Sequence, residues 1–211
     1  MNRADRGASR RLYVETSIEA PLPRLWRLTQ DPRLHARWDL RFGSITPTAP
    51  GRFRYSTFGV HGIGTHAGTR EHDGGAATSA LRFASAHPLS PIAKGAGYWR
   101  YVPDGDRVRF LTGYDYTARH RWADPVVRPL MGWATAWSFD RLRLWAETGQ
   151  SPRRSLLLAL ADLTVRLVPI AVAARRSPGL AAALVPLTCR PVPGRVPSAR
   201  RCRRVPAEAP R

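Results

Sequence analysis

Residues 12–38, "LYVETSIEAPLPRLWRLTQDPRLHARW", decide the fold because they predict one strand followed directly by two short helices. Apolar and polar residues alternate over 12–19, which is typical of a β-strand with one buried face. Pro23 suits the first turn of a helix, and Leu22, Leu25 and Trp26 recur at helical spacing. Asp31-Pro32 ends that helix, and "RLHARWD" (33–39) predicts a second helical turn.

The region from 40 to 149 predicts an antiparallel meander followed by one long helix. Six strand patterns run from "LRFGSITPTA" (40–49) to "RVRFLTGYDY" (107–116), separated by turns such as 73–75 and 103–106. After Asp124-Pro125 a helix is predicted to reach Gly149, with a kink at Pro129. Strands with one aromatic face need a covering layer. We therefore expect an α+β fold of about seven curved antiparallel strands around the long helix, with a cavity between them.

Several of these segments carry a family resemblance. "VETSIEAPLPRLWRLTQDPRLHARWD" (14–39) resembles the opening of the SRPBCC superfamily, which includes START, Bet v 1 and polyketide-cyclase-like proteins. "GYWRYVPDGDRVRFLTGYDY" (97–116) and "RPLMGWATAWSFDRLRLW" (128–145) are similar to a branch of uncharacterised bacterial members. The resemblance implies a helix-grip fold whose cavity holds a lipid, polyketide or other apolar molecule, and some such relatives are cyclases, dehydratases or chaperone co-factors.

Composition divides the chain into four regions. We expect a disordered basic N-terminus at 1–11, the ligand-binding domain at 12–149, a helical extension at 150–188 and a disordered Pro/Arg-rich tail at 189–211. The formal net charge is +19, and residues 151–211 contribute twelve Arg against two acidic residues. Without interleaved aromatic residues or a nucleic-acid fold signature, this charge does not predict specific nucleic-acid binding.

Aromatic side chains supply the candidate binding site. Trp133 and Trp137 lie four residues apart on the predicted long helix, so they point toward the same side, either as core or as the roof of the cavity. Aromatic residues of the sheet are the candidates on the opposite wall. The expected ligand-binding residues are Phe53, Tyr55, Phe83, Trp99, Tyr101, Tyr114, Tyr116, Trp133 and Trp137. The loop over 87–99 is expected to border the cavity mouth, and Arg100 to point outward.

The sequence selects no catalytic residue, metal or cofactor. The six His residues have no metal-ligand spacing, and nucleophile and nucleotide motifs are missing. An acid–base enzyme would have to use His120, Asp115 or a Tyr. Two functions therefore stay open beside simple binding of an apolar molecule or lipid: a cyclase or dehydratase, and a basic protein of the membrane surface.

The extension raises the question of a membrane. Ten Leu, Ile and Val within 156–174 favour insertion by about 4–5 kcal/mol, but Asp162 and Arg166 each cost about 3 kcal/mol. A transmembrane helix is therefore not favoured. The flanking Arg pairs suit an amphipathic helix on anionic lipid, while packing on the domain or on a second subunit is the competing interpretation. No apolar segment follows the basic N-terminus, so we expect a cytoplasmic protein, with peripheral contact at the inner membrane surface through this helix.

Overall fold

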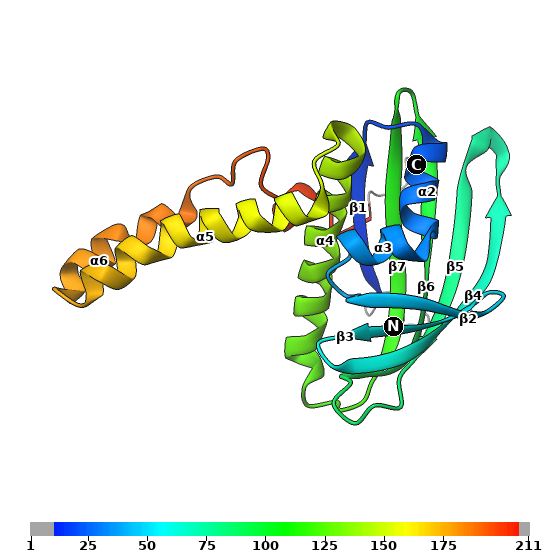
Figure 1. Ribbon diagram of the computed structural model, residues 1–211, viewed down its shortest axis with the longest axis horizontal. Coiled ribbons are helices and arrows are strands. Elements are labelled where there is room, and N and C mark those ends of the chain that lie inside the picture. Colours follow the sequence, from blue (N-terminus) through cyan, green and yellow to red (C-terminus); the bar gives the residue numbers. More distant parts are fainter. Residues whose placement is uncertain (1–10, 207–211) are drawn as a thin grey trace, which may run out of the picture.

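The computed structural model describes residues 11–206 and has an α+β helix-grip fold, as predicted. Seven antiparallel strands form one curved sheet in the order β1-β7-β6-β5-β4-β3-β2, and it curves around the long helix α4 (Figure 1). The strands are β1 Leu12–Ile18, β2 Ser44–Ala49, β3 Arg52–Thr57, β4 Val60–Glu71, β5 Ala77–Ala84, β6 Ile92–Asp104 and β7 Arg107–Ala118.

The helices lie at the predicted places. Two short helices follow β1, and α4 follows β7. The helices are α2 Leu22–Gln30, α3 Pro32–Trp38, α4 Asp124–Thr148, α5 Pro152–Ala174 and α6 Pro178–Leu184, with single 3-10 turns η1 Asp73–Gly75, η2 Val185–Cys189 and η3 Ala199–Arg201. Gly149 ends α4 in the left-handed conformation (φ 71°), which glycine adopts without a steric penalty.

The core fills the space between α4, α2 and the central strands. β1 pairs with β7 in register from Leu12↔Tyr114 to Ile18↔Val108, so their inward faces meet α4 together. Trp38 is fully buried and donates its indole N–H to the carbonyl of Leu28 (2.9 Å), which ties α3 to α2. The large side chains with no exposed surface are Trp38, Tyr101, Phe110, Phe139, Ile18, Leu25, Leu142 and Val14.

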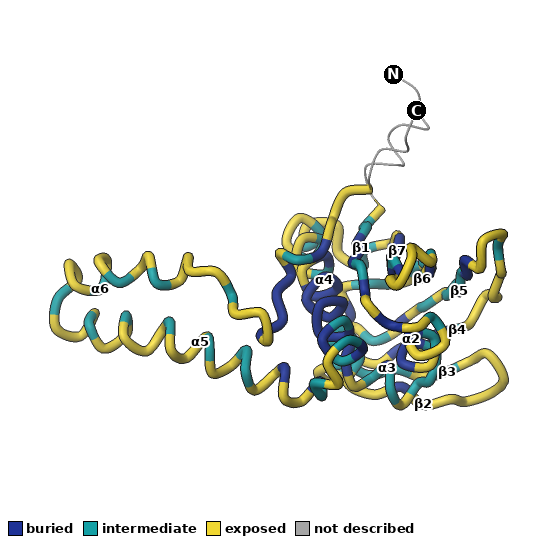
Figure 2. The backbone as a smooth tube through the Cα atoms, turned by 90° about the horizontal axis from the view of Figure 1, so that it is seen from above, coloured by how far each residue is buried: buried dark blue, intermediate teal, exposed yellow. Residues whose placement is uncertain are grey.

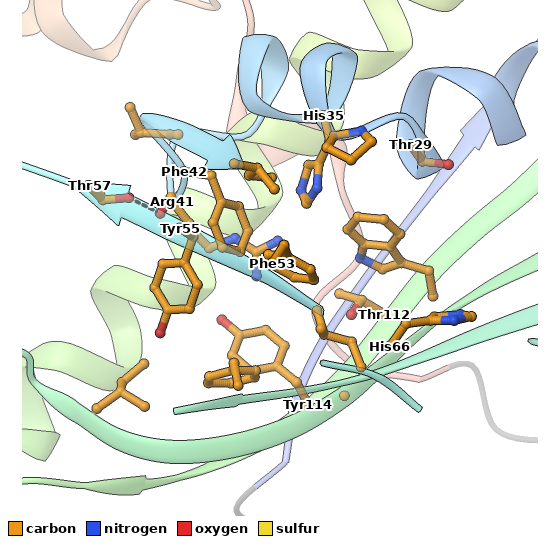
Figure 3. A pocket seen from close by; sticks show the side chains of 18 of the residues that line it. Thr29, His35, Arg41, Phe42, Phe53, Tyr55, Thr57, His66, Thr112 and Tyr114 are labelled. Atoms are coloured by element: carbon orange, nitrogen blue, oxygen red, sulfur yellow. Dashed lines mark hydrogen bonds between the residues drawn. The ribbon is translucent and has the colours of Figure 1, made fainter. Parts of the chain in front are cut away.

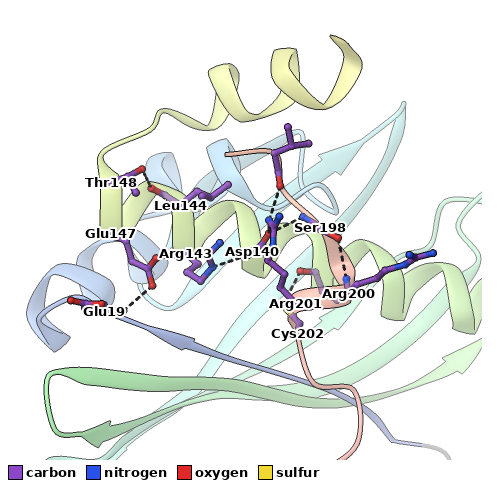
Figure 4. Close-up of polar contacts among 12 residues, drawn as sticks. Glu19, Asp140, Arg143, Leu144, Glu147, Thr148, Ser198, Arg200, Arg201 and Cys202 are labelled. Carbon is purple, nitrogen blue, oxygen red and sulfur yellow. Dashed lines mark hydrogen bonds and ion pairs between the residues drawn. The ribbon is translucent and has the colours of Figure 1, made fainter. Parts of the chain in front are cut away.

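The C-terminal segment 192–203, here called the strap, packs against α4 and corrects the prediction of a disordered tail over 189–211. The buried carboxylate of Asp140 accepts hydrogen bonds from the Ser198 amide (2.7 Å), Arg201 Nη1 (2.8 Å) and Arg143 Nε (2.7 Å) (Figure 4). Cys202 is buried beside the carbonyl of Ala136 (3.2 Å). Pro/Arg-rich composition suggested disorder, but Asp140 supplies an anionic partner for the strap. The terminal stretches 1–10 and 207–211, also predicted to be disordered, lie outside the described residues.

The extension forms a helical hairpin that projects away from the domain (Figures 1 and 2). We call residues 152–189 (α5, α6 and η2) the C-terminal hairpin. Only its base touches the domain: Pro152 and Ser155 are buried and Ala159 packs against the core, whereas α5 beyond Ala159 is exposed or half-buried against α6 and η2. The sequence analysis gave packing on the domain as an alternative to membrane contact. The extension packs on the domain only at its base.

Candidate ligand cavity

A cavity of about 650 Å³ lies between the concave face of the sheet and the N-terminal half of α4. Most of the side chains that line it are apolar, and they come from α2, α3, every strand except β1, and α4. This volume is within the usual range for small-molecule sites in proteins. Figure 3 shows aromatic rings from β3 and β7 converging on the same space.

Six of the nine predicted binding residues line this cavity. They are Phe53, Tyr55, Phe83, Trp99, Tyr114 and Trp133. Tyr114 donates to or accepts from Thr135 of α4 (3.0 Å), which fixes its ring against the helix. Trp133 is 43% exposed, so it closes the edge of the cavity rather than its centre.

The other three predicted residues lie outside the cavity lining, each for a different reason. Tyr101 is fully buried beneath α2, where its hydroxyl bonds to Thr29 (2.7 Å) and Gln30 (2.8 Å). Tyr116 lies one strand repeat beyond Tyr114 and donates to Asp124 at the start of α4 (2.7 Å). Trp137 lies one turn deeper along α4 and stacks on Trp133 (6.3 Å between ring centroids).

Glycines on neighbouring strands make room for the aromatic wall. Phe53 of β3 pairs with Gly64 of β4, and Tyr55 pairs with Gly62. A Cβ atom at Gly64 would lie 2.1 Å from the Phe53 ring, and one at Gly62 would lie 2.4 Å from the Tyr55 ring. The rings therefore lie flat over the bare backbone, as in other sheets where aromatic residues cover glycines, and the cavity stays open above them.

A buried polar trio, His35, Asp39 and Arg41, forms part of the wall beside α3, and the sequence analysis did not single it out. Asp39 accepts Arg41 Nε (2.9 Å) and Nη2 (2.7 Å) and bonds to His35 Nε2 (3.1 Å). His35 and Arg41 reach the cavity, with the Arg41 guanidinium over the rings of Phe42 and Tyr114. The spacing "HARWDLR" (35–41) was the available signal, because it places His and Asp one helical turn apart.

Burial and ion pairing shift the pKa values of this trio. Burial would raise the pKa of Asp39, but Arg41 and His35 hold it well below its ordinary value. Burial lowers the pKa of His35, against the opposing effect of Asp39. Asp39 also raises the pKa of Arg41 despite the burial of the guanidinium. At neutral pH the trio is therefore an ion pair beside a neutral imidazole, and it carries no net charge.

A second polar group lies at the α2 end of the cavity. Ser79 donates to Gln30 Oε1 (3.1 Å) and lies 3.3 Å from His66 Nε2, and all three side chains line the cavity. Gln30 in turn binds Tyr101. Hydrogen-bonding groups thus stand at two places in an otherwise apolar wall, which is the composition that orients a bound molecule.

The remaining sequence candidates fall outside the cavity or at its rim. His120 is exposed beside Trp122, and Asp115 is exposed on the outer side of β7, so neither lines the cavity. Arg100 is exposed, as predicted. The loop predicted over 87–99 is shorter, because β6 already begins at Ile92; residues 90–92 line the cavity.

The fold and cavity define an α+β protein of the helix-grip class. The solution structure of a protein from Arthrobacter aurescens shares this fold, with a TM-score of 0.50 and 14% sequence identity. The match covers 65% of this chain and 86% of that one. A hypothetical protein from Helicobacter pylori, jhp0584, gives a TM-score of 0.49 at 15% identity, over 65% of this chain and 88% of that one. No family model matches the sequence.

A curated relative is similar in sequence. The chain is 42% identical over 165 residues to "Uncharacterized membrane protein YndG" of Bacillus subtilis. This alignment covers 71% of this chain and 62% of the relative. The chain thus spans about three fifths of that protein's length. In the described part of the chain, α5 is the one helix long and apolar enough to cross a membrane.

Proposed function

We propose that the domain binds or carries one apolar small molecule or lipid in the cavity beneath α4. The observation that carries this proposal is the 650 Å³ space lined mainly by apolar side chains. Two polar groups, one around Arg41 and one around Ser79, favour a ligand with a polar end. The resemblance of residues 14–39 to the SRPBCC superfamily supports the same proposal, since its members hold apolar ligands in this place.

The test is ligand capture by the full-length protein, followed by a cavity-filling variant. Native mass spectrometry after purification in mild detergent should detect one bound molecule per chain. Leu81→Trp should abolish capture, because Leu81 lines the cavity and the larger ring occupies it. Ile63→Trp is the matched control, since Ile63 lies on the outer face of the same sheet and is 50% exposed. Equal capture by both variants would show that the ligand binds outside this cavity.

We also propose that the C-terminal hairpin associates with a membrane, so that the protein acts at the cytoplasmic surface. The apolar helix α5 and the membrane protein among its relatives support this part. Flotation of the full-length protein with vesicles of phosphatidylethanolamine and phosphatidylglycerol tests it. Loss of flotation on replacement of residues 156–189 by a short Gly-Ser linker, which keeps the strap on α4, is the expected result, and flotation that survives this deletion would refute it.

The enzyme alternative now depends on His35. His120 and Asp115 lie outside the cavity, whereas His35 lines it and is oriented by Asp39, the arrangement of a general base. Turnover of a polyketide-like substrate that is lost in His35→Gln and kept in His120→Gln would support this alternative. Turnover in both variants would exclude His35 as the acid–base group.

A further inference from the structure

The C-terminal hairpin is apolar on all sides. Between Arg154 and Arg175 the only charged residues are Asp162 and Arg166, and residues 177–189 contain none. At about 100° per residue, the large exposed side chains of α5 span an arc of about 200°, wider than the stripe of a surface helix, and the remaining side of α5 is half-buried, mostly against α6 and η2. The exposed large residues of the hairpin are Leu156, Leu157, Leu160, Leu163, Val165, Leu167, Val168, Val172, Leu180 and Val185.

The two charges of α5 neutralise each other on its inner side. Arg166 donates Nε to Asp162 Oδ2 (2.8 Å) and Nη2 to Oδ1 (3.0 Å), a bidentate pair one helical turn apart. Both side chains face the returning limb of the hairpin (residues 178–191), and Arg166 is only 13% exposed. The spacing of four residues allows this pairing, and the pair presents no net charge to its surroundings.

Several backbone carbonyls at the end of the returning limb accept hydrogen bonds from Arg side chains. Arg166 also donates to the carbonyls of Leu187 (3.3 Å), Thr188 (3.4 Å), Arg190 (2.7 Å) and Pro191 (3.3 Å). Arg201 continues the series and donates to the carbonyls of 192, 193 and 196. Pro at 191 and 193 removes two amide donors. Backbone without regular secondary structure is stable inside a membrane only when its N–H and C=O groups are hydrogen-bonded within the protein.

Both ends of the hairpin are fixed to the domain. Gln150 Nε2 donates to Ser155 of α5 (2.8 Å) and to the carbonyl of Arg195 in the strap (2.8 Å). The Asp140 carboxylate then holds the strap beyond it. The chain must therefore enter and leave a membrane on the side where the domain lies.

We propose that the C-terminal hairpin inserts into the lipid bilayer as two limbs, with its tip at the opposite interface and both ends on the domain side. Arg154 and Arg175 are 21 residues apart, which corresponds to about 32 Å along a helix. The hydrocarbon core of a bilayer is about 30 Å thick, so α5 is long enough to cross it. The Arg pairs 153–154 and 175–176 then reach the two headgroup layers. Arg190 lies beside Arg166, about 18 Å along α5 from Arg154, and its side chain extends from that depth toward the domain-side interface.

The test is cysteine labelling in membranes of a bacterium that expresses the full-length chain. In a Cys189→Ser background, Ser177→Cys marks the tip and Asp106→Cys marks an exposed turn of the domain; Cys202 is buried. Ser177 makes no capping hydrogen bond with its side chain, so this replacement removes no helix cap. A maleimide that cannot cross membranes should label the two cysteines from opposite sides, with about tenfold preference or more in each case.

Arg166→Gln tests the internal clamp, and Arg100→Gln, at an exposed position of the domain, is its matched control. Arg166→Gln should lower the fraction of protein that resists alkaline carbonate about fivefold, because Asp162 and the carbonyls lose their donor. Arg100→Gln should keep the wild-type fraction. Equal fractions would overturn the role of the clamp.

This inference rests on the proposed membrane association, and the outcomes separate the two. Protein that does not bind membranes even at low salt refutes membrane association and insertion together, whereas protein that binds but is released by salt or carbonate overturns insertion alone. Protein that resists carbonate but has its tip labelled from the domain side, or from neither side, overturns the crossing alone. Ligand capture in the cavity is measured on the same preparations and does not depend on either result.

Discussion

Removal of the Asp140 carboxylate should release the strap from α4. Asp140 is fully buried and accepts three hydrogen bonds, from Ser198 N, Arg201 and Arg143, at 2.7–2.8 Å. Asp140→Ala leaves the buried Ser198 amide without its acceptor and breaks two ion pairs. The guanidinium side chains are 20% and 27% exposed, so water partly replaces what they lose. The expected loss is about 3 kcal/mol in the free energy of unfolding.

Urea denaturation in mild detergent measures that loss, and thiol labelling locates it. Burial, followed by the nearby Asp140 charge, raises the pKa of the Cys202 thiol to about 12, whereas Cys189 is exposed. In the wild type only Cys189 should therefore react quickly with a disulfide reagent; in Asp140→Ala, Cys202 should react as well. Asp106→Ala removes a carboxylate from an exposed turn and is the control. A loss below about 1 kcal/mol with Cys202 still protected would refute the reasoning.

Three further outcomes follow from the cavity. Gly64→Ala should cost about 1–3 kcal/mol and reduce ligand capture, because the new Cβ pushes the Phe53 ring into the cavity; Gly194→Ala, at a position with no atoms within 4 Å and no positive φ, should leave capture unchanged. Because burial lowers the pKa of His35 in the folded protein, the unfolded chain takes up its proton first as pH falls below about 6.5. Unfolding free energy should thus rise with pH up to about 6.5, with a smaller slope in His35→Gln; an equal slope in this variant would contradict the role of His35. Leu130→Asp at the rim should slow ligand transfer from vesicles, whereas Leu89→Asp should not, and equal rates would show that transfer does not use this rim.

Local patterns in the sequence predicted most of the fold. Period-two alternation identified β1 and β7, and the helical repeat around Trp26 identified α2, because both depend on neighbours in the chain. Tyr101 and Tyr114 show why the site was only partly predictable. Both point to the concave face of the sheet, but α2 covers Tyr101 and leaves Tyr114 open to the cavity.

The features that sequence reasoning missed depend on contacts between distant residues. The strap has the composition of a disordered tail, and it is ordered by Asp140, which is 58 positions before Ser198. Asp162 and Arg166 of α5 are four residues apart and could be expected to pair, but the contacts of Arg166 with the carbonyls near 190 could not be predicted from the sequence. In each case composition alone would suggest an exposed charge, but the Arg side chain donates hydrogen bonds inside the protein. Arg201 donates to the buried Asp140 carboxylate, and Arg166 donates to backbone carbonyls.

One face of α4 connects the hairpin to the cavity. Trp133 lines the cavity and stacks on Trp137, whose ring lies beneath the Arg141 guanidinium; Arg141 in turn donates to the carbonyl of Pro152, the first residue of α5. These α4 residues recur every four positions, so they share one side of the helix. A bilayer that holds the hairpin would therefore face the exposed rim formed by Leu130 and Trp133. In that arrangement an apolar ligand passes between lipid and cavity without crossing water, which explains why one chain would combine a membrane hairpin with a ligand-binding domain.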